Sequence, residues 1–331
     1  MNKLLVTGGA GYIGSHIVKA LLEKNYQVLV VDNFSTGHLE PLQNLQKKYP
    51  ALSYVKADLS DQEKIKEIFS KYEIDAVIHL AAKIEVNESV KNPGLYHQEN
   101  FVNSINLVEA MSEAGVNKLI FSSTAAVYGN PKYSPIDENH STLPLNPYGQ
   151  SKLDFEKYLH KCQNLKYVIF RYFNVGGSAL DSSIGKSHLQ SQDLIENLIK
   201  TALNQKEYFE IFGSDYDTND GTAVRDLVHV EDVAAAHLLA LKKIDFYAGQ
   251  IFNLGSEEGF SVKEIVSKAQ EITGKKINLK YSPRREADIS VSVASAKKAQ
   301  NELGWKPQNS NVDSIISSDW RWRKKHPFCY T

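Results

Sequence analysis

The stretch "TGGAGYIGSH", Thr7 to His16, decides the fold class through the spacing of its glycines. It directly follows the apolar run Leu4–Thr7, which is typical of a buried strand, and it opens a segment with helical periodicity. Glycines at such a turn let the backbone approach a pyrophosphate, and the N–H groups of the first helical turn bind phosphate oxygens. The predicted phosphate-binding residues are Gly8, Gly11, Tyr12, Ile13 and Gly14.

An acidic residue at the end of the second predicted strand indicates which dinucleotide binds. Asp32 comes directly after Gln27–Val31, and a carboxylate there accepts hydrogen bonds from the adenosine ribose and repels a 2′-phosphate. Asn33 follows it, with no Arg alongside to hold such a phosphate. The sequence therefore favours NAD over NADP. After the third predicted strand, Asp58 and Leu59 are expected near the adenine, with a helix cap as the alternative role of Asp58.

Short apolar runs alternate with helical patterns through the first half of the chain. The runs are rich in Val, Ile and Leu, as expected of parallel strands buried on both faces. They are Leu4–Thr7, Gln27–Val31, Ser53–Lys56, Ala76–Leu80, Lys118–Ser122 and Tyr167–Arg171. The clearest helix is Asp61–Tyr72, where Ser60 and Glu63 have the spacing of a capping box. This alternation predicts an α/β fold with a Rossmann-type doubly wound parallel sheet.

The pattern changes after Asn174. Residues 176–192 are small and polar and are predicted to form a loop that leaves the sheet. The elements expected beyond it are a helix near Leu194–Asn204, a strand pair around Glu210–Phe212 and Leu227–Val230, a helix Val233–Leu241, a strand Ile251–Leu254 and a helix capped by Ser261 and Glu264. We therefore expect an NAD-binding domain at residues 1–174, with a return of the chain around 226–255, and a smaller mixed α/β substrate domain at residues 175–331.

Composition excludes several classes of function. Lys and Arg number 38 against 39 Asp and Glu, so no basic surplus points to nucleic acid or to an anionic membrane. Cys162 and Cys329 are too few for a disulfide framework, and the ten His show no metal-ligand spacing. No signal-peptide pattern or membrane-spanning apolar run occurs, so we expect a cytoplasmic protein without a metal.

A second stretch, "NPYGQSKLDFEKYL" (Asn146–Leu159), carries the candidate catalytic pair. Its apolar spacing predicts a helix, with Asn146 as the cap and Pro147 in the first turn. Tyr148 and Lys152 then share a face because they stand at i and i+4. A nearby cation and a helix N-terminus favour the phenolate, so the pattern predicts a Tyr pKa lowered toward use as a base. The alternative for the pair alone is a surface Tyr beside a solvated Lys.

The order of motifs along essentially the whole chain resembles the extended short-chain dehydrogenase/reductase superfamily. The shared motifs are T-G-x-x-G-x-x-G (Thr7–Gly14), "HLAA" (His79–Ala82), "FSSTAAVYG" (Phe121–Gly129), "YGQSK" and "RYFN". Within that superfamily the chain is similar to UDP-glucose/UDP-galactose 4-epimerases. The motifs for this are "ESV" (Glu88–Val90), "IFGSDYDTNDGTAVRDLVHV" (Ile211–Val230), "PRREAD" (Pro283–Asp288) and W-x-W-x-x-x-H-P (Trp320–Pro327).

The resemblance implies a catalytic role for the Tyr–Lys pair. Tyr148 takes the proton of the sugar 4′-hydroxyl while C4 gives a hydride to NAD⁺, and Lys152 holds the nicotinamide ribose and lowers the Tyr pKa. The Thr124 hydroxyl bonds the substrate oxygen. The keto-sugar then turns and receives the hydride on its other face. Lys83 and Asn100 correspond to residues on the cofactor side.

A UDP-sugar site in the second domain is also implied by the resemblance. The corresponding residues are Asn174, Arg225 and Arg285 for the diphosphate, Asp288 for the uridine ribose and Ser292 for the hexose pocket. A small residue at Ser292 resembles the epimerases that also accept N-acetylated sugars. The alternative is that Ser292 points away or that Val291 fills the gap.

Three further expectations depend on the resemblance. Ala125 and Ala126 follow Thr124 and carry no titratable group, so oxidation and reduction at C4 without elimination fits best. The competing functions are a net NAD-dependent oxidoreductase and a non-catalytic relative.

The segment "SQDLIEN" departs from the family pattern. It places Asp193, or Asn197 after a shift, at a position that contacts substrate in the family. A homodimer is implied through helices near Leu95–Ala114 and Gly149–Cys162, although their apolar positions could instead all face the sheet.

Overall fold

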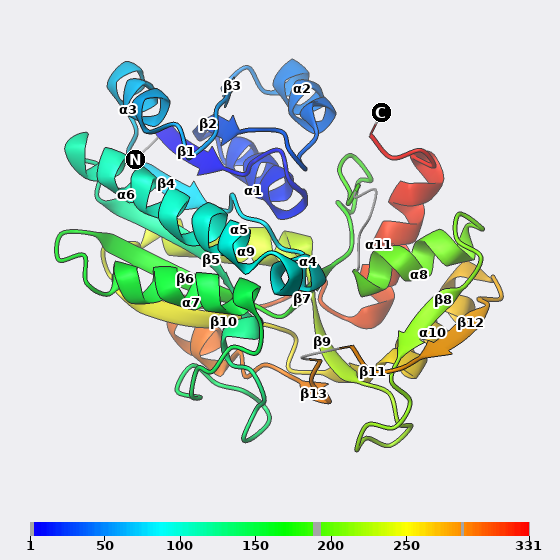
Figure 1. Cartoon of the computed structure of the whole chain (residues 1–331). Helices are drawn as coiled ribbons and strands as arrows, with labels where there is room; N and C mark the ends of the chain where they lie inside the picture. Colours follow the sequence, from blue (N-terminus) through cyan, green and yellow to red (C-terminus); the bar gives the residue numbers. More distant parts are fainter. Residues whose placement is uncertain (1–2, 188–192, 286–287, 331) are drawn as a thin grey trace. The chain divides into compact units, whose positions relative to one another are not determined.

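The computed structural model describes residues 3–187, 193–285 and 288–330, and their contacts divide the chain into two compact units (Figure 1). The first unit comprises Met1–Val127, Thr142–Arg171 and Ala234–Phe252, and the second comprises Tyr128–Ser141, Tyr172–Val233 and Asn253–Thr331. The short segment 128–141 belongs to the second unit because long-range bonds hold it there. Ile136 N–H donates to the Val293 carbonyl at 2.8 Å, and Asn253 N–H donates to the Glu138 carboxylate at 2.7 Å.

A seven-stranded sheet with the order β10-β6-β5-β4-β1-β2-β3 forms the centre of the first unit. Its strands are β1 (Lys3–Thr7), β2 (Gln27–Asp32), β3 (Leu52–Lys56), β4 (Ala76–His79), β5 (Lys118–Thr124), β6 (Lys166–Tyr172) and β10 (Gln250–Leu254). The pairs β2–β3, β1–β2, β1–β4 and β4–β5 are parallel. The predicted strands and the doubly wound sheet are therefore confirmed.

Helices and two short helical turns connect these strands. They are α1 (Tyr12–Glu23), α2 (Leu39–Lys48), α3 (Gln62–Lys71), α4 (Val86–Lys91), α5 (Pro93–His97), a π-helical turn (Gln98–Val102), α6 (Asn103–Glu113), a 3₁₀ turn (Ala125–Val127), α7 (Pro147–Leu159) and α9 (Val230–Lys242). The cap of α3 differs from the prediction. The N-cap is Asp61, one residue later than predicted, and it accepts from Lys64 N–H at 3.0 Å, whereas the Ser60 hydroxyl donates to Asp58 at 2.6 Å.

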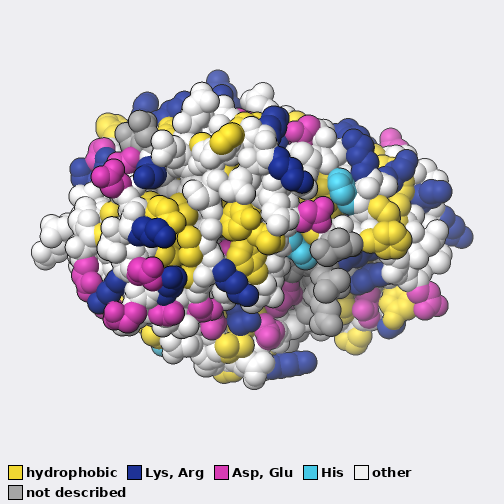
Figure 2. All heavy atoms as spheres, turned by 90° about the horizontal axis from the view of Figure 1, so that it is seen from above, with side chains coloured by type: hydrophobic (Ala, Val, Ile, Leu, Met, Phe, Trp, Pro, Cys, Tyr) yellow, Lys and Arg dark blue, Asp and Glu magenta, His cyan; other side chains and the backbone are white. Residues whose placement is uncertain are grey.

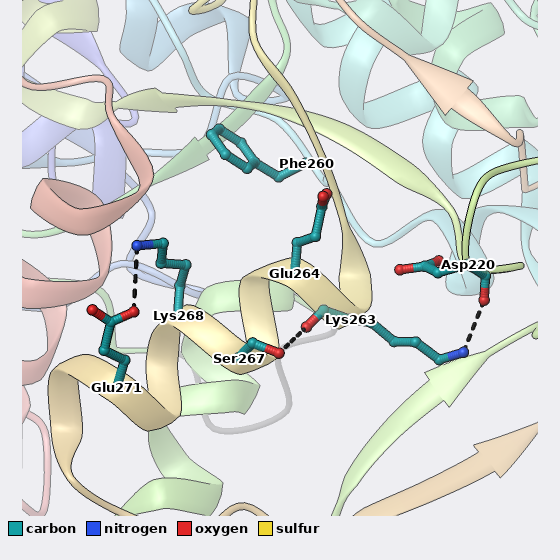
Figure 3. Close-up of a pocket in the computed structure, with 7 residues that line it drawn as sticks. All are labelled: Asp220, Phe260, Lys263, Glu264, Ser267, Lys268 and Glu271. Atoms are coloured by element: carbon teal, nitrogen blue, oxygen red, sulfur yellow. Dashed lines mark hydrogen bonds and ion pairs between the residues drawn. The ribbon is translucent and has the colours of Figure 1, made fainter.

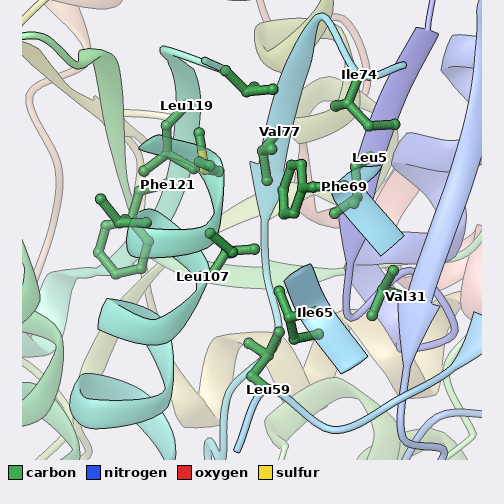
Figure 4. Close-up of a cluster of buried hydrophobic side chains, with 14 of the residues drawn as sticks. Leu5, Val31, Leu59, Ile65, Phe69, Ile74, Val77, Leu107, Leu119 and Phe121 are labelled. Carbon is green, nitrogen blue, oxygen red and sulfur yellow. The ribbon is translucent and has the colours of Figure 1, made fainter. Parts of the chain in front are cut away.

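The core of the first unit lies where α3, α6 and α7 pack on one face of the sheet (Figure 4). Leu5 and Val31 come from the strands, and Ile65 and Leu107 come from α3 and α6. Phe155 of α7 is fully buried, and its ring centroid lies 4.7 Å from that of Phe121 on β5. Such an edge-to-face pair stabilises the fold by about 0.5–1.5 kcal/mol beyond the contribution from burial of its apolar surface. This packing fixes α7 beside the end of β5.

The second unit is a smaller mixed α/β assembly. Its elements are β7 (Asn174–Gly176), α8 (Leu194–Ala202), β8 (Phe209–Phe212), β9 (Val224–His229), β11 (Gly259–Ser261), α10 (Val262–Thr273), β12 (Leu279–Ser282), β13 (Val291–Ser292), a π-helical turn (Ala299–Leu303) and α11 (Val312–Lys325). The capping box of Ser261 and Glu264 is confirmed at the start of α10. The expected pairing of β8 with β9 is wrong, because β8 pairs with β12 and β9 pairs with β7, β11 and β13.

The surface drawn in Figure 2 mixes small hydrophobic areas with basic and acidic side chains, which agrees with the near-zero net charge of −1. No helix among the described residues is long and apolar enough to cross a membrane.

Replacing Gly14 by Ala tests the tight β1–α1 turn. An added Cβ would lie 2.1 Å from the Gly8 carbonyl oxygen, so the backbone must shift, and we expect Gly14→Ala to lose about 1–3 kcal/mol of unfolding free energy. Gly94→Ala is the matched control in helix α5, because its Cβ would meet nothing within 4 Å. Denaturant unfolding followed by circular dichroism measures both variants. Equal stability of the two would contradict the packing described for this turn.

Candidate active site

The predicted cofactor residues lie where the strand order of the sheet reverses. β1 pairs with β2 on one side and with β4 on the other, and ligands of doubly wound sheets bind outside the carboxyl ends of strands at such a point. The glycine loop leaves β1 here, and the "HLAA" segment leaves β4. The two approach closely, because a Cβ on Gly8 would lie 2.6 Å from the Ala81 nitrogen.

The geometry of the glycine loop fits a bound pyrophosphate. Gly8 has a φ of +70°, which favours glycine, and Gly11 N–H donates to the Gly8 carbonyl at 3.1 Å. Helix α1 begins at Tyr12 with Gly11 as its N-cap, so no capping side chain covers the N–H groups of Tyr12 and Ile13. The first N–H groups of a helix have no intrahelical acceptor, and a helix start of this kind is suited to phosphate oxygens.

The end of β2 provides a carboxylate suited to a ribose. Asp32 accepts from Ala10 N–H at 3.0 Å and from Phe34 N–H at 2.8 Å, and each oxygen retains capacity for a further donor. Burial raises the pKa of Asp32, while these two backbone bonds lower it. The side chain is thus held in place beside the glycine loop, as an NAD ribose requires.

Asn33, Asp58 and Leu59 occupy the neighbouring strand ends. Asn33 donates to Asp58 at 2.6 Å, which joins the ends of β2 and β3. Although burial works in the opposite direction, hydrogen bonds from Asn33 and Ser60 lower the pKa of Asp58. Leu59 has its side chain in the hydrophobic core, and its carbonyl accepts from Asn106 at 3.0 Å. Its side chain therefore serves packing, and its contact with adenine stays a prediction.

The candidate catalytic residues meet at the end of β5. Asn146 caps α7 by accepting from Gly149 N–H at 2.8 Å, and Pro147 is the first helical residue, as predicted. Tyr148 is half-buried and has a hydrogen bond with Thr124, the last residue of β5. The Lys152 ammonium donates to the Ser122 carbonyl at 2.9 Å. The structure thus brings together Thr124, Tyr148 and Lys152.

The ionisation of the pair differs from the expectation. Burial raises the pKa of Tyr148, and the hydrogen bond with Thr124 opposes that rise only in part. Burial also lowers the pKa of Lys152 to about 7. The predicted lowering of the Tyr pKa is therefore wrong for the chain without ligands. The reason is desolvation, which disfavours the charged form of both groups and which helical spacing alone does not reveal.

Lys83 and Asn100 are joined on the cofactor side. Lys83 N–H donates to the Asn100 side chain at 2.8 Å, and the Asn100 amide donates back to the Lys83 carbonyl at 2.9 Å. The same amide reaches Ser151 of α7 at 3.1 Å. Asn100 lies in the π-helical turn, and such turns often occur at functional sites.

His79 is the last residue of β4, and its side chain is part of the core. It is fully buried, with Nδ1 2.7 Å from the Thr7 hydroxyl and Nε2 2.8 Å from the Ser104 hydroxyl. Burial lowers the pKa of His79 to about 3, so the ring is neutral.

The second unit holds the residues predicted for a nucleotide diphosphate. Arg225 on β9 forms an ion pair with Asp288 and donates to the Val224 carbonyl at 2.9 Å. The Arg285 guanidinium lies over the Phe212 ring at 3.9 Å, and its buried Nε has no partner among the described residues. Burial lowers the pKa of Arg285. A desolvated guanidinium with an unused donor is suited to a phosphate oxygen.

The register of β9 positions the remaining predicted residues of this unit. Ser292 on β13 is the register partner of Arg225, and Asn174 on β7 is the partner of Leu227. Ser292 is 7% exposed. Asp193 caps α8 by accepting from Glu196 N–H at 2.9 Å and pairs with Lys186 at 2.9 Å. Asp193 therefore has a structural role whatever else it contacts.

Sequence reasoning missed two aromatic residues beside the arginines. Phe212 stacks on Arg285, and Tyr216 hydroxyl donates to Asp288 at 3.3 Å. Both belong to the motif "IFGSDYDTNDG", so their place in that motif is the sequence signal that could have identified them.

A surface pocket of about 410 Å³ lies elsewhere, along α10 (Figure 3). It is lined by Asp220, Phe260, Lys263, Glu264, Ser267, Lys268 and Glu271. Lys263 donates to the Asp220 carbonyl at 2.8 Å, and Lys268 pairs with Glu271 at 3.3 Å. Because its ammonium groups already have partners and it contains none of the predicted site residues, we do not assign it as the active site. The described residues contain no His, Cys, Asp or Glu group able to hold a metal ion.

Comparison with known proteins identifies the relatives of the chain. Residues 4–255 match the NAD dependent epimerase/dehydratase family. A UDP-glucose 4-epimerase of Halalkalibacterium halodurans is 43% identical over 333 residues, covering 99% of this chain and 97% of that protein.

Solved structures show the same similarity. UDP-glucose 4-epimerase from Bifidobacterium longum, in complex with NAD⁺ and UDP, has a TM-score of 0.95 at 35% identity, covering 99% of this chain and 100% of that one. The UDP-Glc/GlcNAc 4-epimerase from Campylobacter jejuni has a TM-score of 0.85 at 39% identity, covering 98% of this chain and 100% of that one.

The buried Lys152 predicts a pH dependence of stability. Its pKa is about 7 in the folded chain and has the ordinary value of 10.5 when unfolded, so the unfolded chain binds more protons between these values. The free-energy cost of burying the charged Lys152 is fully present below about pH 7 and decreases as the pH rises toward 10.5. The free energy of unfolding of the nucleotide-free wild type, relative to that of Lys152→Met, should rise by at least about 1 kcal/mol from pH 7 to pH 9.5. Urea unfolding at both pH values measures this, and a pH-independent difference would contradict it.

Proposed function

Since the chain belongs to the NAD dependent epimerase/dehydratase family, we propose that it interconverts UDP-glucose and UDP-galactose through a 4-keto intermediate. It is a UDP-hexose 4-epimerase that holds NAD as its cofactor. The observation that carries this function is similarity to UDP-glucose 4-epimerases along the full chain, at 43% identity over 333 residues in one relative.

Tyr148 is the proposed base, because its phenol lies beside Thr124 at the end of β5. NAD⁺, when bound, would supply a hydride acceptor for C4. Tyr148 would take the proton of the sugar 4′-hydroxyl in the oxidation at C4 and would return it to the same oxygen in the reduction, so that the configuration at C4 is inverted without net oxidation.

Lys152 and Thr124 support this proton transfer. The described residues give the Lys152 ammonium one acceptor, the Ser122 carbonyl at 2.9 Å, so donors remain for the hydroxyls of the nicotinamide ribose. The Thr124 hydroxyl bonds the substrate oxygen and the phenol. Ala125 and Ala126 add no acid or base beside Thr124, which favours a simple redox cycle over elimination.

The UDP group is assigned to the second unit. Arg225, Arg285 and Asn174 hold the diphosphate, and Asp288 binds the uridine ribose. The support is the pair of guanidinium groups on adjacent segments, one with its Nε unused, which provides the forked donors that phosphate prefers.

A small residue at Ser292 suggests a broad sugar preference. A Tyr side chain at this position would fill about the space that a 2-acetamido group needs, whereas a Ser leaves that space open. The similarity to an epimerase described as acting on UDP-Glc and GlcNAc supports this. We therefore propose UDP-N-acetylglucosamine and UDP-N-acetylgalactosamine as further substrates.

A homodimer is proposed through α5, α6 and α7. The ring centroids of exposed His97 and half-buried Phe101 lie 5.0 Å apart, and those of Phe101 and half-buried Tyr158 lie 6.5 Å apart, so aromatic side chains connect the segment 97–101 with α7. Leu95 is 37% exposed. The compartment proposed is the cytoplasm, where the two free cysteines stay reduced.

Tyr148→Phe tests the reaction itself. The variant should fold, retain NAD and lose epimerisation of UDP-galactose by at least about 10²–10⁴-fold, because the base is removed. Chromatographic detection of UDP-glucose measures the rate. A variant that retained more than about a tenth of the wild-type rate would exclude Tyr148 as the base. Wild-type turnover that required added NAD(H) would instead support a net oxidoreductase.

Ser292→Tyr tests the sugar preference. The phenol should suppress turnover of UDP-N-acetylgalactosamine and spare that of UDP-galactose. Parallel assays of wild type and variant with both sugars measure the ratio of kcat/KM. No turnover of either N-acetylated sugar by the wild type would refute the proposed pocket while leaving the epimerase function intact.

Light scattering tests the proposed homodimer. We expect about twice the chain mass of 37.1 kDa at micromolar concentration. Replacing Phe101 and Tyr158 by Glu should halve the mass, because charged groups are costly inside an apolar interface. A wild type with the mass of one chain would rule the dimer out.

A further inference from the structure

Three buried polar residues behind the candidate base form a connected group: Ser123 on β5, Glu156 on α7 and Arg171 on β6. They are 3%, 1% and 4% exposed, respectively. The Ser123 hydroxyl donates to Glu156 Oε1. Arg171 donates to both oxygens of the same carboxylate, from Nε at 3.1 Å and from Nη2 at 2.5 Å.

This group joins the elements that carry the catalytic residues. Glu156 stands four residues after Lys152, and Ser123 stands between Ser122, the Lys152 acceptor, and Thr124. Two consecutive residues of β5 are thus bonded to two successive turns of α7. One bond is Lys152 to the Ser122 carbonyl at 2.9 Å, and the other is Ser123 to Glu156. These bonds set the position of Thr124 relative to Tyr148.

Glu156 also supplies negative charge near the buried ammonium of Lys152. The other titratable groups that face Lys152 are His79 on β4, which is neutral, and Tyr148 on α7, which is protonated at neutral pH. Arg171 on β6 is cationic and is bonded to Glu156. The centroid of the Phe121 ring lies 4.8 Å from the Lys152 ammonium. Among these described groups, Glu156 is the anion that favours the charged form of Lys152.

We infer that Glu156 is a positioning residue for the epimerase reaction, which ties Thr124 to α7 through Ser123 and places a carboxylate one helical turn from Lys152. This inference rests on the proposed function. Glu156 has two effects, a geometric one through its bond to Ser123 and an electrostatic one through its charge near Lys152. A separate variant tests each effect.

Glu156→Gln removes the charge and keeps an oxygen for Ser123. Arg171 then lies near Lys152 without its carboxylate, so Lys152 loses its proton at a lower pH. We expect kcat for UDP-galactose to fall at least about tenfold near pH 8, with KM changed less than about twofold. The alkaline limb of the kcat–pH profile should move to lower pH, so the loss is smaller at pH 6.

Ser123→Ala breaks the bond to β5 and keeps the charged pair. It should lower kcat at every pH with no shift of the profile, because a small misplacement of reacting groups slows the chemical step. Asp154→Asn is the matched control, since Asp154 is another carboxylate on α7 and accepts from the exposed Gln150 at 2.7 Å. It should leave kcat and the profile unchanged. Bound NAD and circular dichroism verify that each variant is folded.

A double variant covers the case in which Glu156→Gln does not fold. Glu156→Met with Arg171→Met replaces the buried pair by apolar groups of similar length, which proteins often tolerate. It should retain the lowered kcat, because Ser123 loses its acceptor, and the alkaline limb should shift less than in Glu156→Gln, because the charge of Arg171 is removed as well. Wild-type kcat and profile in Glu156→Gln or in the double variant, measured beside an active wild type, would overturn the inference. An inactive wild type would instead contradict the proposed function.

Discussion

Burial of the Lys152 ammonium against the end of β5 is the constraint on which the candidate site of the first unit depends. A buried cation is tolerated only where hydrogen bonds and nearby anions offset its lost hydration. The Ser122 carbonyl and the Phe121 ring provide that environment at 2.9 and 4.8 Å, respectively. Helix α7 must therefore lie very close to β5 and the turn after it. Gly149 permits this, since a Cβ there would lie 2.7 Å from the Ala126 carbonyl oxygen.

Burial shifts the pKa of both members of the catalytic pair away from the state that the reaction needs. It raises the pKa of Tyr148 and lowers that of Lys152, so burial favours a neutral phenol and a partly neutral amine. The proposed reaction needs a base at Tyr148 and a cation at Lys152. Hydroxyl acceptors for the ammonium and a positive charge near the phenol both reverse these preferences. An oxidised dinucleotide carries both, so the proposed reaction would couple cofactor binding to activation of the base. This coupling suits an enzyme whose cofactor is regenerated in each cycle.

Local patterns predicted much of the fold, and they supplied candidates for the site residues. The strands of the sheet, the cap at Asn146 and the capping box at Ser261 follow from periodicity and from short-range hydrogen bonds, and these were confirmed. The pairing of β8 with β12 and the bonds that hold residues 128–141 join distant segments, so no local pattern reports them. The same limit applies to pKa values. Spacing places Tyr148 beside Lys152, but desolvation depends on the whole set of surrounding atoms.

The second unit shows how an arginine pair can be both stable without ligand and ready for one. Arg225 is neutralised by Asp288, which avoids an unpaired buried charge. The Arg285 guanidinium lies over the Phe212 ring at 3.9 Å, and its buried Nε has no partner among the described residues. A guanidinium has enough donors for Arg225 to keep Asp288 and still contact an anion. A Lys at either position would lose the forked geometry, and at Arg285 it would also lose the stacking that fixes the plane. The planar shape of Arg, in addition to its charge, therefore supports the diphosphate site proposed in this unit.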